Sequence, residues 1–141
     1  MKILIMGLPD SGKTTLGKKL SKQYSIPFWD ADVVRKVYND WDFTLQGRER
    51  QALRMRKLSE LDPISISAFI CPLPTLRTYF LPDKVIWMNT VKGCEYEDTN
   101  DLFSPPKKYD VMITKLGDDN EAFDLVKDCR ILAARRTYDY I

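Results

Sequence analysis

The stretch Met1–Leu20, MKILIMGLPDSGKTTLGKKL, decides the fold. It opens with the apolar run Ile3–Met6, whose length and β-branched content predict a strand buried on both faces. Gly7–Thr14 comes next and fits the pattern G-x-x-x-x-G-K-[ST] at every fixed position. The residues after it, with Leu16 and Leu20, have helical spacing. The strand before and the helix after that this motif requires are therefore both present.

This motif predicts a site for a nucleoside triphosphate. Backbone N–H groups between the two glycines form a concave anion site, and the following helix adds its partial positive charge. Gly12 lets the backbone approach phosphates where a Cβ would clash. Lys13 places an ammonium on the β- and γ-phosphates, and the Thr14 hydroxyl is placed to bind Mg²⁺. The alternative, a glycine-rich turn with a solvated lysine, fits this context less well. The expected ATP-binding residues are Gly7, Leu8, Pro9, Asp10, Ser11, Gly12, Lys13, Thr14 and Thr15.

Size and composition predict one soluble globular domain, residues 1–141, with 44% apolar and 30% charged residues. The 22 basic against 20 acidic residues give no electrostatic case for binding nucleic acid or a membrane surface. The three cysteines lie far apart in a chain without histidine, which argues against a zinc site or disulfide framework and for the cytoplasm. The N-terminal apolar run is too short for a signal peptide or a membrane span.

The rest of the chain alternates predicted strands with predicted helices. Further strands are expected at 26–29, 64–70, 84–88 and 109–113, and helices at 13–24, 33–38, 44–61, 75–79 and from about 118. This alternation argues for a parallel sheet with helices on both faces and a site at the carboxyl ends of the strands. The segment 89–108 has weak periodicity and mixed charge, and we expect it to be mobile.

The predicted helix at 44–61 carries an arginine inside its apolar stripe. At 100° per residue, the stripe is formed by Leu45, Ala52, Met55 and Leu58. Arg48 lies in the middle of the stripe, with Gln51 beside it. The other basic residues are expected in solvent: Arg50, Arg54 and Lys57. A buried arginine needs an anionic partner, which is either an internal aspartate or a phosphate or sulfate group of a substrate.

Asp30 and Asp32 follow the second predicted strand. Carboxylates at such a strand end can accept a proton from a substrate hydroxyl or hold Mg²⁺ through water. Either aspartate can instead cap the following helix, and spacing alone does not separate the two interpretations. Phosphoryl transfer depends mainly on positioning and charge neutralisation, so the absence of histidine is no obstacle.

Four segments in order resemble the adenylylsulfate (APS) kinase family. They are Gly7–Thr15, DADVVR at 30–35 (family D-G-D-x-x-R), FTLQGR at 43–48 (family F-S-x-x-x-R) and SAFICP at 67–72 (family S-F-I-S-P). The resemblance covers about residues 1–115. It implies an α/β three-layer P-loop NTPase fold, whose five-stranded parallel sheet has the order 2-3-1-4-5. It also implies ATP-dependent phosphorylation of the 3′-hydroxyl of adenylylsulfate, a step of sulfate assimilation, with ATP and Mg²⁺. The implied partners are small nucleotides, and a homodimer is left open.

The resemblance also implies roles for single residues. Asp30 and Asp32 would lie near Mg²⁺ and the accepting hydroxyl, so the catalytic set is Lys13, Asp30 and Asp32, and the metal set is Thr14 and Asp30. Arg35 and Arg48 would hold the phosphosulfate, Phe43 would pack on adenine, and Ile70 with the Cys71 backbone would close that pocket. The implied acceptor-binding residues are Asp32, Arg35, Phe43, Arg48, Gln51, Ile70 and Cys71.

The sequence departs from this family mainly after the fourth predicted strand. The family carries a long Lys/Arg-rich lid there, which is truncated here, with Glu97 in place of an arginine and Asn100 in place of a lysine. Ala31, Gln51 and Cys71 are smaller departures from a glycine, an asparagine and a serine. Cationic lid groups stabilise charge on the transferring phosphoryl group. Two alternatives therefore stay open: a P-loop kinase for another small nucleotide or metabolite, and a degenerate nucleotide-binding regulator.

Overall fold

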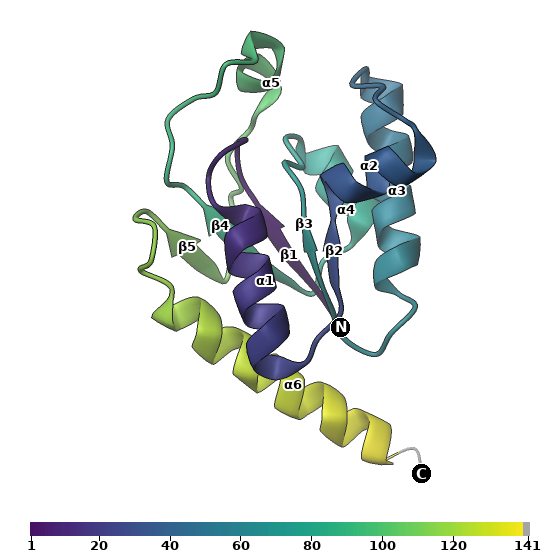
Figure 1. Ribbon diagram of the computed structural model, residues 1–141, viewed down its shortest axis with the longest axis vertical. Helices are drawn as coiled ribbons and strands as arrows, with labels where there is room; N and C mark the ends of the chain where they lie inside the picture. Colours follow the sequence, from purple (N-terminus) through teal and green to yellow (C-terminus); the bar gives the residue numbers. More distant parts are fainter. Residues whose placement is uncertain (140–141) are drawn as a thin grey trace.

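The computed structural model describes residues 1–139, which fold into one five-stranded parallel sheet with helices on both faces. The strands are β1 (Lys2–Met6), β2 (Phe28–Asp30), β3 (Ser65–Ala68), β4 (Lys84–Met88) and β5 (Val111–Ile113). The helices are α1 (Lys13–Tyr24), α2 (Ala31–Tyr38), α3 (Leu45–Ser59), α4 (Pro74–Phe80), α5 (Glu97–Leu102) and α6 (Asn120–Asp139). The strand order is β2-β3-β1-β4-β5, which confirms the predicted α/β fold and order (Figure 1).

The central strand β1 supplies both halves of the core. Its side chains at Ile3 and Ile5 pack with α1 and α6, whereas Leu4 and Met6 pack with α2, α3 and α4. All four are fully buried. A parallel strand covered on both faces is apolar at every position and does not alternate, which is why the run Ile3–Met6 could be recognised in the sequence.

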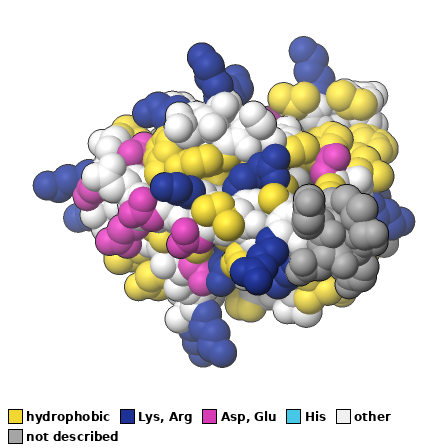
Figure 2. Space-filling model, turned by 90° about the horizontal axis from the view of Figure 1, so that it is seen from below, with side chains coloured by type: hydrophobic (Ala, Val, Ile, Leu, Met, Phe, Trp, Pro, Cys, Tyr) yellow, Lys and Arg dark blue, Asp and Glu magenta, His cyan; other side chains and the backbone are white. Residues whose placement is uncertain are grey.

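Several predicted side-chain positions are wrong. Leu45, placed in the apolar stripe of α3, is 52% exposed, because the helix begins there. Arg54, expected in solvent, is mostly buried and bonds to Asp40 and Gln51. Among residues 120–136 of α6, the buried side chains are the small or branched ones, Ala122, Val126, Cys129 and Ala133. On the face seen in Figure 2, basic, acidic and apolar side chains are interspersed.

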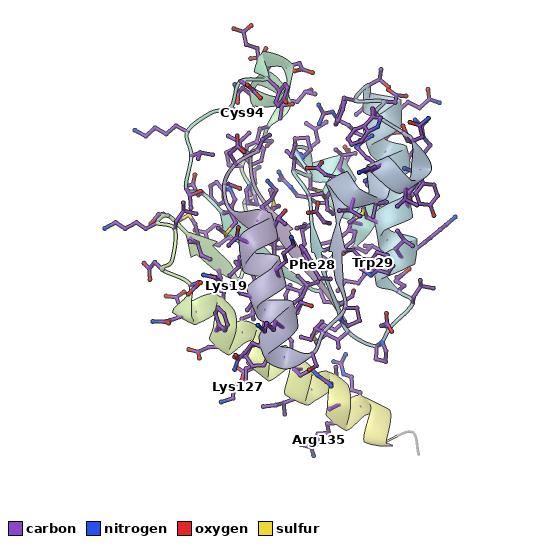
Figure 3. All side chains as sticks on the ribbon, viewed as in Figure 1. Lys19, Phe28, Trp29, Cys94, Lys127 and Arg135 are labelled. Carbon is purple, nitrogen blue, oxygen red and sulfur yellow. The ribbon has the colours of Figure 1, made fainter. Side chains whose placement is uncertain are left out.

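The segment between β4 and β5, which has weak periodicity in the sequence, is held by several hydrogen bonds. Thr90 Oγ1 donates to the Ser11 carbonyl at 2.7 Å, and the Ser104 N–H donates to the Pro72 carbonyl at 2.7 Å. The Asn100 amide exchanges two hydrogen bonds with the Cys94 backbone, at 2.9 and 2.8 Å. These bonds place α5 near the loop that follows β1, and Cys94 lies at the opposite end of the molecule from Arg135 (Figures 1 and 3).

Within residues 1–139, no helix combines the length and the apolar character needed to cross a membrane.

Asp40 organises the connection between α2 and α3. Its carboxylate accepts from Arg50 Nε at 2.8 Å and from Arg54 Nη2 at 2.9 Å, while its carbonyl accepts from Arg35 Nη1 at 2.9 Å. Hydrogen bonds from Arg50 and then Arg54 hold the pKa of Asp40 well below its usual range. The connection therefore depends on this carboxylate being ionised.

We expect Asp40→Asn to lower the free energy of unfolding at neutral pH, because the charge-assisted bonds to Arg50 and Arg54 become weaker. A carboxylate with a lowered folded-state pKa adds stability above its unfolded pKa of about 3.9 and loses it as pH falls towards the folded value. Urea unfolding should show a larger difference between Asp40→Asn and wild type at pH 7 than at pH 3, where only part of the contribution is lost. The control is Asp62→Asn, at an exposed position. An equal difference at both pH values would contradict this account.

Candidate active site

The loop Gly7–Thr14 joins β1 to α1, and its two glycines are required by the backbone. Gly12 has φ 97°, and a Cβ there would lie 2.7 Å from Leu116 Cδ2. Gly7 has φ 151°, and its Cβ would lie 2.6 Å from the Met88 carbonyl oxygen. Asp10 also has a positive φ of 65°, which aspartate tolerates better than most residues. The glycines of the sequence motif therefore correspond to a tight turn against β4.

Lys13 is held inside this loop. Its Nζ donates to the Leu8 carbonyl at 2.7 Å and to Ser11 Oγ at 3.4 Å. Burial lowers the pKa of Lys13 to about 8, although the carboxylates of Asp32, Asp30 and Asp10 act in the opposite direction. An ammonium whose direct partners are neutral oxygens is further stabilised by an anionic ligand, as a phosphate would be.

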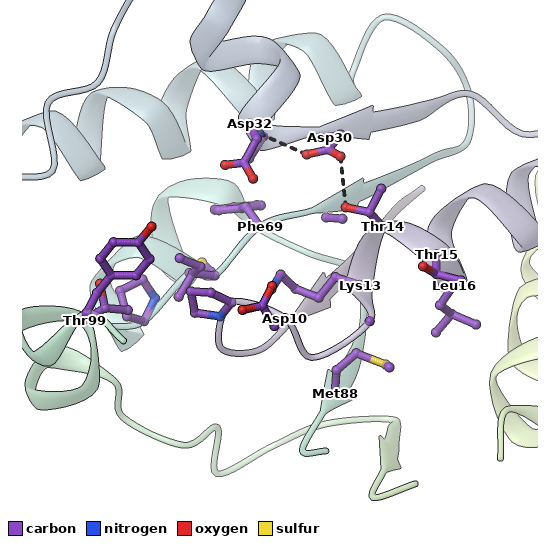
Figure 4. A pocket seen from close by; sticks show the side chains of 18 of the residues that line it. Asp10, Lys13, Thr14, Thr15, Leu16, Asp30, Asp32, Phe69, Met88 and Thr99 are labelled. Carbon is purple, nitrogen blue, oxygen red and sulfur yellow. Dashed lines mark hydrogen bonds between the residues drawn. The ribbon is translucent and has the colours of Figure 1, made fainter. Parts of the chain in front are cut away.

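Asp30 connects the loop to the second strand. Its Oδ2 accepts from Thr14 Oγ1 at 2.9 Å, and its Oδ1 accepts from the Asp32 N–H at 3.0 Å (Figure 4). The second bond caps α2. Asp30 therefore caps the helix, as one of the two interpretations predicts, and its other carboxylate oxygen faces Thr14. Metal binding by Asp30 stays a prediction.

The donor set of Thr14 and Asp30 fits Mg²⁺. Magnesium binds hard oxygen atoms and usually takes only one or two carboxylates, with substrate phosphates and water as its other ligands. A hydroxyl and a carboxylate oxygen in direct contact at the phosphate loop provide this chemistry. Among the described residues, no group of three or more His, Cys, Asp or Glu side chains could hold a metal ion by itself. Such a group is not required where a nucleotide supplies part of the coordination.

Asp32 lies beside Asp30 at the start of α2 (Figure 4). Burial raises the pKa of Asp32, the Asp30 carboxylate raises it further, and Lys13 and Arg35 act against this shift. A carboxylate with a raised pKa accepts a proton from a hydroxyl more readily than an ordinary aspartate. The general-base role of Asp32 stays a prediction.

One cavity of about 1020 Å³ brings these groups together with the predicted acceptor residues. The predicted residues that line it are Pro9, Asp10, Gly12, Lys13, Thr14, Thr15, Asp30, Asp32, Arg35, Phe43, Arg48, Gln51, Ile70 and Cys71. The other three, Gly7, Leu8 and Ser11, are buried and do not line this cavity. The cavity thus joins the phosphate loop to both arginines in one continuous space.

Arg35 and Arg48 are both buried on the far side of this cavity, with 5% of each exposed. Arg35 Nη1 donates to the carbonyls of Asp40 and Asp42 at 2.9 and 3.2 Å, and Arg48 Nε donates to the Phe43 carbonyl at 2.9 Å. Their guanidinium carbons lie 4.3 and 5.4 Å from the centroid of the Phe43 ring. Burial lowers the pKa of both arginines. Main-chain carbonyls fix their orientation and leave other N–H groups of each fork for further partners.

Two predicted acceptor residues have clear structural roles. Gln51 Nε2 donates to the Ala31 carbonyl at 3.1 Å and its Oε1 accepts from Arg54 Nη1 at 2.8 Å, so its amide ties α3 to α2. Burial raises the pKa of Cys71 to about 12, which keeps its thiol protonated, and its carbonyl accepts from Arg77 Nε at 3.1 Å. Acceptor binding by Gln51 and Cys71 stays a prediction.

Several residues that line the cavity are not predicted from the sequence. They are chiefly Trp41, Phe69, Leu76, Met88, Glu95, Tyr96, Asp98 and Thr99. Trp41, 51% exposed in the loop before Phe43, is the one with a usable signal, because a large exposed aromatic residue beside predicted binding residues suggests a contact surface. The residues of α5 have no such signal, since a helix of 6 residues is too short to show periodicity.

Neither a protein-family model nor a curated protein matches the chain. Solved structures resemble it at low identity. A gluconokinase from Sinorhizobium meliloti 1021 has a TM-score of 0.63 and 14% identity, covering 99% of this chain and 94% of that one. A shikimate kinase from Aquifex aeolicus has a TM-score of 0.57 and 17% identity, with 98% and 99% covered. The Mycobacterium tuberculosis APS kinase CysC in complex with AMPPNP and APS has a TM-score of 0.63 and 15% identity, with 95% and 96% covered. The chain therefore has the fold of P-loop small-molecule kinases.

We expect ATP with Mg²⁺ to raise the melting temperature, because a ligand that binds only the folded state stabilises it, by about 2.7 kcal/mol at a hundredfold excess over Kd. Lys13→Ala should remove most of this shift, since it deletes the cation inside the loop. Differential scanning fluorimetry measures both. Lys22→Ala, at an exposed position in the last turn of α1, should respond like wild type. Equal shifts for wild type and Lys13→Ala would show that the phosphate loop is wrongly assigned.

Proposed function

We propose that this protein is an ATP-dependent kinase that phosphorylates the 3′-hydroxyl of adenylylsulfate in the cytoplasm. One observation carries the proposal: a single cavity joins the loop around Lys13 to the buried pair Arg35 and Arg48. Asp32 interacts electrostatically with Lys13 on one side and Arg35 on the other. A site built this way has a cation for the donor phosphates, a base in the middle and cations for an anionic acceptor.

In this proposal, different side chains bind the donor and accept the proton. Lys13 neutralises the β- and γ-phosphates of ATP, and Asp32 accepts the proton of the attacking hydroxyl. A bond forms between that oxygen and the γ-phosphorus while the bond to the β–γ bridging oxygen breaks, and ADP leaves. Thr14 and Asp30 would hold Mg²⁺, which would supply neutralisation of charge on the phosphates of the nucleotide. Positioning provides most of the remaining catalysis.

On the acceptor side, Arg35 and Arg48 bind the phosphosulfate and the Phe43 ring packs on adenine. Two features support this assignment. Both guanidinium groups are buried in the cavity wall, where charge-assisted bonds are strongest. The Phe43 ring is 42% exposed, so part of it is free to contact a base. Ile70 and the Cys71 backbone line the same cavity and complete the pocket.

A second candidate is a kinase for another small hydroxylated metabolite. Glu95 and Asp98 line the cavity in the segment where the APS kinase family has a Lys/Arg-rich lid, and Asp98 lies beside Arg48. Carboxylates there are less favourable for a phosphosulfate than for an acceptor with fewer charges. The structural neighbour described as a gluconokinase has the same TM-score as the APS kinase, 0.63, and the one described as a shikimate kinase has 0.57.

We expect Arg48→Lys to weaken the binding of adenylylsulfate on the order of tenfold, because lysine keeps the charge but loses the planar fork that grips an oxyanion. ATP affinity should hardly change. Isothermal titration of each nucleotide separates the two effects. The matched control is Arg56→Lys on the same helix, at a position that does not line the cavity. A loss confined to ATP binding, or to folding stability, would show that Arg48 has no acceptor role.

We expect slow phosphorylation of adenylylsulfate, with kcat below the 1–100 s⁻¹ typical of kinases. The reason is that α5 brings acidic and not basic residues over the cavity, so less positive charge stabilises the transferring phosphoryl group. An ATP-consumption assay with adenylylsulfate, gluconate and shikimate tests this, with Lys13→Ala as the blank. Faster turnover of gluconate or shikimate would establish the second candidate. No turnover above the blank with any acceptor would favour a nucleotide-binding regulator.

A further inference from the structure

Helix α5 brings two side chains against Arg48. Thr99 Oγ1 accepts from Arg48 Nη2 at 3.4 Å, and Asp98 Oδ2 lies 4.0 Å from the same nitrogen. Thr99 is 4% exposed and lies on the buried side of α5. The Asp98 side chain is 71% exposed and lines the cavity. The carboxylate nearest to Arg48 therefore stands in the space where an acceptor would bind.

The two acceptor-side arginines differ in how their charge is balanced. Arg35 pairs with Asp40, which does not line the cavity and is held by Arg50 and Arg54. Arg48 has Asp98 as its one ion-pair partner within residues 1–139. A pair at 4.0 Å with one partner mostly in solvent is weak. A bound anion can therefore replace Asp98 as the counter-ion of Arg48. Asp40, the counter-ion of Arg35, is instead held in place by Arg50 and Arg54.

We propose that Asp98 is a specificity-determining residue that competes with the anionic group of an acceptor for Arg48. An anion that binds Arg48 must displace the Asp98 carboxylate or bind in spite of its repulsion. An uncharged ligand is not repelled by Asp98 and does not compete with it for Arg48. Asp98 thus selects against negative charge at this end of the cavity. The identity of the acceptor rests on the function proposed above, but the competition for Arg48 does not.

The anchors of α5 make Asp98 suitable for substitution. The helix is held by the Asn100–Cys94 hydrogen bonds and by the bond from Ser104 to Pro72, none of which uses Asp98. Asp98→Asn is nearly isosteric and removes only the charge. Asp101→Asn is the matched control, because Asp101 is exposed on the same helix and does not line the cavity.

The test is isothermal titration with the phosphate loop saturated by ADP and Mg²⁺. The probes are adenylylsulfate, inorganic sulfate and adenosine, of which only the first two carry negative charge. Asp98→Asn should bind both anions about two- to tenfold more tightly than wild type, the modest change expected for an exposed pair, with adenosine unchanged. Asp101→Asn should match wild type. In an Arg48→Gln background, Asp98→Asn should give no gain.

Other outcomes separate the competition from the proposed function. Sulfate binding that tightens in Asp98→Asn, with no binding of adenylylsulfate to any variant, would support the competition and reject adenylylsulfate as acceptor. Anion affinities that are equal in wild type and Asp98→Asn, or undetectable in all variants, would overturn the competition. So would an equal gain in Asp101→Asn, a gain that persists with Arg48→Gln, or weaker anion binding in Asp98→Asn.

Discussion

The site depends on the Asp30 carboxylate, which accepts from Thr14 Oγ1 and from the Asp32 N–H. Thr14 follows β1, whereas Asp30 ends β2, and β3 separates these two strands in the sheet. The carboxylate therefore bridges the carboxyl ends of two strands that are not neighbours. It fixes the phosphate loop against the start of α2, so the position of Asp32 is tied to that of Lys13. Because the strands are parallel, both ends lie at the same edge of the sheet.

Lys13, Arg35 and Arg48 each have at least one carboxylate nearby, and the position of that carboxylate differs among the three. Lys13 is near Asp32, Asp30 and Asp10, which all oppose the effect of burial on its pKa. Arg35 is balanced from outside the cavity by Asp40, which also joins α2 to α3 through Arg50 and Arg54. The charge on Arg48 faces an exposed carboxylate of α5. Of the two arginines, Arg35 has a counter-ion that also stabilises the fold, whereas the counter-ion of Arg48 can be displaced. This difference underlies the proposed selectivity.

The structural neighbours explain why fold and substrate are separate questions for this chain. A gluconokinase, a shikimate kinase and an APS kinase all superpose over nearly the whole chain at 14–17% identity. Such similarity reflects a shared sheet and phosphate loop, whereas acceptor choice depends on a few side chains in connecting segments. In this chain the connecting segments that line the cavity include the loop around Trp41 and Phe43 and the region of α5.

The sequence by itself determined the strand, the glycine turn and the helix of residues 1–20, because a doubly buried parallel strand and a phosphate loop each require specific local residues. It also placed Asp30 and Asp32 at the end of a strand and Arg48 on the buried face of its helix, because strand ends and helical spacing are local properties. Only the tertiary structure decided which charge each buried cation meets. Arg48 and Asp98 lie far apart in the sequence, and their contact depends on a short helix anchored by backbone hydrogen bonds. Local patterns carry no information about such contacts, since they arise from how separate connecting segments pack over the sheet.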